Sequence, residues 1–173
     1  NMIRFYFDYL SPFAYFAWLR LDEIEAATGQ DIEPIPILFA GLLNHWGQKG
    51  PAEISPKRDY VFTQCLRYAN KHNIDFTMPK YHPFNPITAL RLSLVEVAWK
   101  QQRQVIHMLW QAAWQAGKDL ADKEVLRELL VTNNFPLPWL ERTTEQAIKD
   151  QLKANTEEAI SQQLFGVPSF VID

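Results

Sequence analysis

The chain has 173 residues, of which 47% are hydrophobic and 21% charged, and its formal net charge is −3 at pH 7. This size and composition predict a soluble globular protein with one sizeable core. The scattered Lys and Arg residues form no basic patch, which excludes a nucleic-acid-binding role, and no apolar run reaches the roughly 18–20 residues of a membrane span.

Residues 3–8 begin the chain with a strand pattern, because apolar and polar side chains alternate there. A helix is predicted over residues 12–28. Pro12 suits its first helical position, and Gly29 suits the residue that ends it.

A second strand is predicted over residues 32–39. It carries Pro34 and Pro36, which lack an N–H group and would cost a central strand two ladder bonds, so we expect it at a sheet edge. The helix between the two strands would then be the crossover of a parallel β-α-β unit. Residues 40–56 are predicted to be a loop, whose glycines and large apolar residues suit a binding loop.

Most of the remaining chain shows helical patterns. We expect helices over residues 57–72, 86–101, 104–116, 122–132 and 143–163, with irregular segments at 73–84 and 133–138. The last helix would open with a capping box of Thr143 and Gln146. Residues 166–173 predict a late strand, which can share one sheet with the β-α-β unit if the helices are an insertion. The strand order would be edge strand, first strand, late strand, in an α/β fold.

The cysteine and histidine residues further limit the class of protein and the kinds of site that the chain can form. Cys65 is the single cysteine, so no internal disulfide can form, and we expect a reducing, cytoplasmic location. It shares helical spacing with apolar neighbours such as Val61 and Ala69, which predicts a buried and inert thiol. The four histidines lack the spacing of metal ligands, and we expect no metal site.

The turn between the first strand and the first helix carries the most chemical information. Unpaired N–H groups at a helix start stabilise an anion, and thioredoxin-like redox proteins place a Cys-x-x-Cys motif there. Here Ser11 and Ala14 occupy the two cysteine positions. Such a site would act on a thiol brought by a bound molecule. The alternative is that Ser11 is only a helix cap.

Five segments, spread in order over nearly the whole chain, resemble the 2-hydroxychromene-2-carboxylate isomerases, relatives of the kappa-class glutathione transferases and of DsbA-type oxidoreductases: residues 7–15, 41–47, 56–58, 82–86 and 166–170. The resemblance implies a thioredoxin-like fold with a large all-helical insertion. Residues 1–45 and 145–173 would form the discontinuous thioredoxin-like domain, and residues 46–144 the insertion. The family continues with another strand and a helix, so we expect the sequence to be incomplete after Asp173; the alternative is that this copy lacks these elements.

The resemblance also implies the residues of a glutathione site. Ser11 would be the catalytic group that hydrogen-bonds the glutathione sulfur. Val167, before a cis Pro168, would pair its backbone with the cysteinyl amide of glutathione. Gln48 and Lys57 fall where kappa-class enzymes contact glutathione. The weaker candidates for the pocket of the second substrate are Trp46, Tyr81, Phe84 and Asn85.

Three of these residues have simpler explanations. Lys57 can be a solvated residue of a first helical turn, Gln48 an ordinary loop residue, and Asn85 a helix cap.

The activity implied by the resemblance is glutathione-dependent isomerisation of 2-hydroxychromene-2-carboxylate, or of a related electrophilic acid from aromatic catabolism, through reversible addition of the glutathione thiolate. The alternatives are a kappa-like transferase that conjugates electrophiles and a non-redox module that binds thiols or peptides. The same resemblance implies a homodimer.

Overall fold

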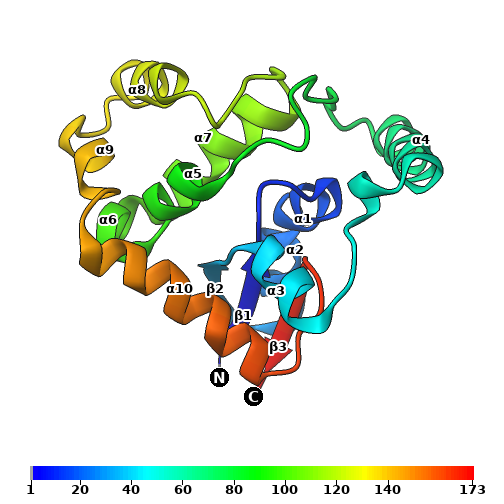
Figure 1. The fold of residues 1–173 in the computed structure, drawn as a ribbon, viewed down its shortest axis with the longest axis horizontal. Helices are drawn as coiled ribbons and strands as arrows, with labels where there is room; N and C mark the ends of the chain where they lie inside the picture. Colours follow the sequence, from blue (N-terminus) through cyan, green and yellow to red (C-terminus); the bar gives the residue numbers. More distant parts are fainter. Residues whose placement is uncertain (1) are drawn as a thin grey trace.

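In the computed structural model, which describes residues 2–173, a small sheet lies beside a larger group of helices (Figure 1). The strands are β1 (Met2–Phe7), β2 (Asp31–Pro36) and β3 (Ser169–Ile172), in the order β2-β1-β3. Strand β1 pairs in parallel with β2 and antiparallel with β3. The predicted strand order is confirmed, and so is the thioredoxin-like class of the fold.

The edge position of β2 is also confirmed. Pro34 lies opposite Phe5 and Pro36 opposite Phe7 in the β1–β2 register. Because β2 has a strand neighbour on one side only, proline can occupy it without breaking a second ladder.

The single helix predicted over residues 12–28 is wrong. The segment forms α1 (Pro12–Trp18) and α2 (Leu21–Thr28), with exposed Leu19 and Arg20 between them. The Arg20 N–H donates to the Ala17 carbonyl at 3.0 Å, a tightened bond that ends α1. No glycine or proline marks this break, so local sequence gave no signal for it. Gly29 does end α2, with a φ of +68°.

The loop predicted over residues 40–56 is also wrong, because this segment holds α3 (Phe39–Trp46) and the 3₁₀ helix η1 (Pro51–Glu53). Gly41 lies inside α3, where a Cβ atom would come within 2.8 Å of the Thr156 Cγ2 atom. This glycine therefore permits close packing of two helices and does not mark a flexible loop.

The other helices run along the chain as follows: α4 (Ser55–Lys71), α5 (Ile87–Leu92), α6 (Val95–Ala98), η2 (Trp99–Gln101), α7 (Gln102–Trp114), α8 (Lys123–Thr132), α9 (Pro138–Arg142) and α10 (Gln146–Ser161). The continuous helix predicted over 86–101 is broken after Leu92, where the Ser93 hydroxyl donates to the Ala89 carbonyl at 2.7 Å. The capping box is wrong as well, because the Thr143 hydroxyl bonds to Leu140 and no side chain caps α10.

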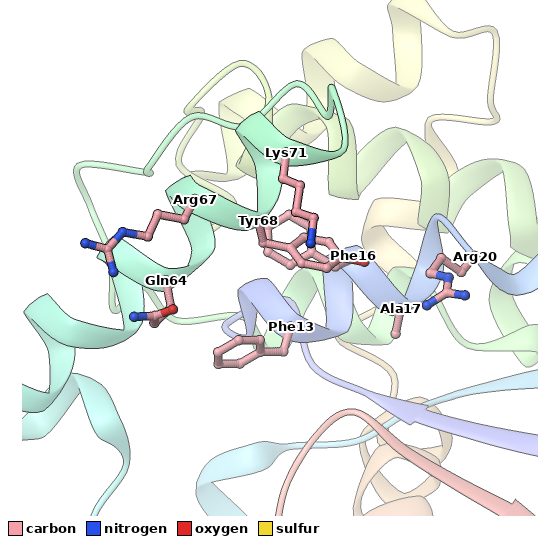
Figure 2. Close-up of a pocket in the computed structure, with 8 residues that line it drawn as sticks. All are labelled: Phe13, Phe16, Ala17, Arg20, Gln64, Arg67, Tyr68 and Lys71. Atoms are coloured by element: carbon pink, nitrogen blue, oxygen red, sulfur yellow. The ribbon is translucent and has the colours of Figure 1, made fainter.

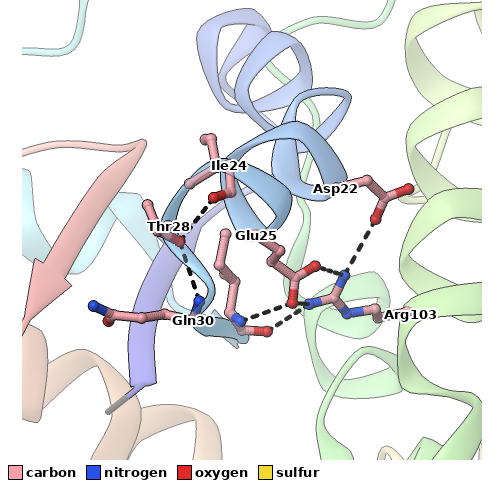
Figure 3. Close-up of polar contacts among 7 residues, drawn as sticks. Asp22, Ile24, Glu25, Thr28, Gln30 and Arg103 are labelled. Carbon is pink, nitrogen blue, oxygen red and sulfur yellow. Dashed lines mark hydrogen bonds and ion pairs between the residues drawn. The ribbon is translucent and has the colours of Figure 1, made fainter.

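Helix α7 ties the helical part to the sheet. Its Arg103 donates to both carboxylate oxygens of Glu25, at 2.8 and 3.0 Å, and to the Ile32 carbonyl at 2.6 Å (Figure 3). At the other end of α7, the Trp114 indole N–H donates to the Tyr9 carbonyl at 2.8 Å. The Arg103 bonds hold α2 and β2 against α7, and the Trp114 bond holds the segment that leads from β1 into Ser11.

Cys65 lies with no exposed surface in the hydrophobic core that also contains Phe7 of β1 and Trp110 of α7, so its predicted burial is confirmed. Among residues 2–173, no helix combines the length and the apolar composition needed to cross a bilayer. The same residues contain no group of three or more His, Cys, Asp or Glu side chains that could hold a metal ion.

Candidate active site at the Ser11 turn

A cavity of about 540 Å³ opens beside the turn between β1 and α1. This volume is within the usual range for small-molecule sites. The walls come from the β1–α1 turn, α3, the following segment with η1, the start of α4, and the segments around His82 and Val167. The polar side chains that line it include Ser11, Asn44, Gln48, Glu53, Arg58 and His82.

Ser11 is 8% exposed and makes two hydrogen bonds. Its Oγ atom accepts from the Ala14 N–H at 3.1 Å, so the helix-cap interpretation is confirmed. The same hydroxyl donates to the Val167 carbonyl at 3.3 Å. Because α1 has only seven residues, its electrostatic effect on an anion comes from the N–H groups of its first turn and not from a long helix.

Asp8 stabilises this turn through backbone hydrogen bonds, a role that the sequence did not predict. Its carboxylate accepts from the Leu10 N–H at 3.0 Å and from the Phe39 N–H at 2.8 Å. It thereby joins the end of β1 to the start of α3, and α3 lines the cavity. Burial raises the pKa of Asp8 to about 7, although the two backbone donors oppose that rise.

His82, in the segment between α4 and α5, stabilises the same turn by a hydrogen bond. Its Nε2 atom lies 2.8 Å from the Leu10 carbonyl oxygen and donates to it, since a carbonyl can only accept. Burial lowers the pKa of His82, so the neutral ring with a proton on Nε2 is favoured. Its Nδ1 atom is buried and has no hydrogen-bond partner among residues 2–173.

Two side chains at the end of α3 hold the segment that leads into Val167. The Trp46 indole N–H donates to the Leu164 carbonyl at 2.9 Å, and the Gln48 amide donates to the Phe165 carbonyl at 3.1 Å. The Val167-Pro168 peptide bond is cis, as the resemblance implies.

The structure brings three of the predicted site residues together at the cavity: Ser11, Gln48 and Val167. Pro168 follows directly in the chain, and Trp46 acts on the same segment through Leu164. Lys57 is exposed in the first turn of α4 and does not line the cavity, whereas its neighbour Arg58 does.

The remaining candidates for the pocket of the second substrate lie elsewhere. Phe84 is only 6% exposed and belongs to the core. Asn85 accepts from the Ile87 N–H at 3.0 Å, as a residue at a helix start does. Tyr81 is 49% exposed, with the Lys80 amine 5.0 Å from its ring centroid. None of these three side chains lines the cavity.

The chain's one cysteine cannot serve this cavity. Cys65 does not line it, and burial raises the pKa of its thiol to about 11. The thiolate is the reactive form of cysteine, so this side chain is a poor nucleophile near neutral pH. The site therefore offers a hydroxyl, backbone groups, the Arg58 cation and the Glu53 carboxylate, and any reacting thiol must come from a bound molecule.

Comparison with protein-family models matches residues 2–173 to the DSBA-like thioredoxin domain. Glutathione S-transferase kappa 2 of Caenorhabditis elegans is 27% identical over 180 residues, covering 97% of this chain and 79% of its own. A 2-hydroxychromene-2-carboxylate isomerase of Pseudomonas sp. (strain C18) is 28% identical over 180 residues, covering 99% and 81%. A solved 2-hydroxychromene-2-carboxylate isomerase matches the fold with a TM-score of 0.88 at 22% identity, covering 100% of this chain and 86% of its own.

Proposed function

Because this chain belongs to the DSBA-like thioredoxin domain family and is similar to an isomerase and a kappa-class transferase over nearly its whole length, we propose that it is a glutathione-dependent isomerase. The proposed substrate is an electrophilic aromatic acid, 2-hydroxychromene-2-carboxylate or a related compound. The observation that carries this proposal is the Ser11 hydroxyl, which faces the Val167 carbonyl at 3.3 Å in a cavity that contains no cysteine.

The residues at this cavity fit a tripeptide thiol. The Ser11 hydroxyl donates one hydrogen bond, which could turn from the Val167 carbonyl to a sulfur anion. The Val167 carbonyl would then be free to accept an amide N–H from the same ligand. Gln48 and Arg58 line the same cavity and could bind polar or carboxylate groups. Bound glutathione would supply the nucleophilic thiol that the chain lacks.

The chain's own residues would act mainly by positioning and by electrostatics. The Ser11 hydroxyl and the Phe13 N–H in the first turn of α1 would favour a thiolate over a thiol, with each pKa unit of lowering worth about 1.4 kcal/mol. Asp8 and His82 would keep the turn in place through the Leu10 backbone, where both of them bond. The aromatic rings of Phe13, Phe39 and Phe62 would form an apolar wall for an aromatic substrate.

The isomerisation of 2-hydroxychromene-2-carboxylate, followed by absorbance with and without glutathione, tests this proposal. We expect turnover only when glutathione is present. S-Methylglutathione, which keeps the peptide but has no free thiol, should compete with glutathione and support no turnover. Equal turnover with and without glutathione, or equal turnover with S-methylglutathione, would contradict the proposed role of the thiol.

A kappa-like transferase is the second candidate, favoured by the 27% identity to the C. elegans kappa enzyme. The same activated thiol would then remain attached to the electrophile. Conjugation of 1-chloro-2,4-dinitrobenzene without any activity in the isomerase assay would select this function.

Trp46→Phe tests whether the end of α3 positions the Val167 backbone. The variant keeps an aromatic ring but removes the N–H that donates to Leu164. A hydrogen bond of this kind is worth about 1 kcal/mol, so calorimetry should show glutathione binding weakened by up to about fivefold. Trp99→Phe, at a ring that is 69% exposed in the helical part, is the matched control and should bind like the wild type. Equal affinities for all three proteins would exclude this positioning role.

A further inference from the structure

A second cavity, of about 550 Å³, lies between α1 and α4 (Figure 2). One wall carries Phe13, Phe16 and Ala17 of α1, with Arg20 just beyond the end of that helix. The opposite wall is one face of α4 with the spacing i, i+3, i+4 and i+7: Gln64, Arg67, Tyr68 and Lys71. We call this cavity the α1–α4 groove.

The floor of the α1–α4 groove is aromatic. Phe16 is 6% exposed, and its ring centroid lies 4.7 Å from that of Tyr68 on the opposite helix. Phe13 is 45% exposed at one end of the groove and also lines the Ser11 cavity. The floor can therefore cover an apolar chain or ring.

All charged side chains that line the groove are positive: Arg20, Arg67 and Lys71. None of its lining residues is acidic, although the chain as a whole has a net charge of −3. Arg20 is already bound by Glu23, at 3.1 and 3.2 Å. Arg67 and Lys71, by contrast, form no ion pair with any of residues 2–173.

These two cations stand four residues apart on α4, where like charges disfavour the helix. In Figure 2 the Lys71 side chain points from α4 toward α1, whereas the Arg67 guanidinium extends outward, away from α1 and from the Lys71 amine. An anion beside the Lys71 amine would supply a counter-charge that no side chain among residues 2–173 provides.

We propose that the α1–α4 groove binds an amphipathic organic carboxylate. Its apolar part would lie on Phe16 and Tyr68, and its head group would meet the Lys71 amine, with Arg67 adding positive charge to the same helix. The volume of the groove is in the range of small-molecule sites. This site does not depend on the activity proposed for the Ser11 cavity, because its cations line only the groove.

Calorimetric titration with octanoate tests the site, with 1-octanol as the uncharged probe of the same chain length. We expect octanoate to bind the wild type, 1-octanol to bind at least tenfold more weakly, and saturating glutathione to leave octanoate binding unchanged. The double variant Arg67→Gln, Lys71→Gln should weaken octanoate binding at least tenfold. Ala17→Leu, which narrows the groove without changing its charge, should also weaken it.

The matched control is the double variant Lys118→Gln, Lys149→Gln, which removes the same charge at exposed positions outside the groove and should bind octanoate like the wild type. Thermal melts should show that all variants fold. The proposal is overturned if the wild type does not bind octanoate, if the control loses as much affinity as the groove variant, if 1-octanol binds equally well, or if glutathione displaces octanoate.

Discussion

Ser11→Ala is expected to lower glutathione-dependent turnover by about 10- to 100-fold, because a hydrogen bond to a charged group is worth roughly 1.5–3 kcal/mol. The loss of turnover should come from a smaller fraction of bound glutathione in the thiolate form. In the wild type, the pH–rate profile should rise at a pH below the ordinary thiol pKa of about 8.5. In the variant, that rise should move toward the ordinary value. Steady-state rates between pH 6 and 10 measure both effects.

Ser11 also caps α1, so stability must be separated from activity. Ser11→Gly removes the hydroxyl at a cost of a few tenths of a kcal/mol, whereas alanine at an N-cap costs about 1 kcal/mol. The two variants should therefore lose turnover equally but differ in their unfolding midpoints. Asp122→Ala removes the cap of α8, which is remote from the cavity, and should cost stability without changing turnover. A pH–rate profile that does not change in Ser11→Ala would exclude thiolate stabilisation by this hydroxyl.

Asp8→Ala should have the largest effect on stability. The substitution leaves the buried N–H groups of Leu10 and Phe39 without an acceptor, at about 1–3 kcal/mol each. We expect the free energy of unfolding, measured in urea, to fall by about 2–5 kcal/mol. Asp8→Asn keeps one acceptor oxygen and should lose about half as much. Asp31→Ala, at an exposed position in β2, should stay within about 0.5 kcal/mol of the wild type.

The pH dependence gives a second measure of Asp8. Its pKa is about 7 in the folded state and about 3.8 when unperturbed. The folded protein therefore binds more protons than the unfolded chain between these values, and the stabilisation from Asp8 is lost as pH rises toward and through 7. The difference in stability between wild type and Asp8→Ala should be larger at pH 5 than at pH 8. A difference that grows with pH would mean that the pKa of Asp8 is not raised.

The sheet was predictable because its signals are local. Alternation in β1 and the proline pair in β2 give the strands and the edge position without any knowledge of the packing. The breaks near Leu19 and Ser93 were not predictable, because a single tightened or competing hydrogen bond ends each helix. Gly41 misled the prediction, since its signal for a loop is the same as its signal for close packing of two helices.

The residues of the candidate site fall into the same two groups, those with a local sequence signal and those without one. Ser11 and Val167, which line the cavity, could be singled out from the sequence because each lies in a short motif at an element boundary. Asp8 and His82 were missed because their role is to bond backbone groups of Leu10 and Phe39, and the partner is visible only in the fold. Phe84 and Asn85 were assigned to a pocket by the resemblance, whereas one lies in the core and the other bonds at the start of α5.

The burial of Cys65 has a consequence for how oxidative stress would affect this protein. Its thiol is fully covered, and its high pKa keeps it out of the reactive form. Under the proposed function, peroxide would stop turnover by consuming the small thiol in solution and would leave the chain's own sulfhydryl intact. Activity should then return as soon as a reductase restores the thiol pool, with no repair of the protein itself.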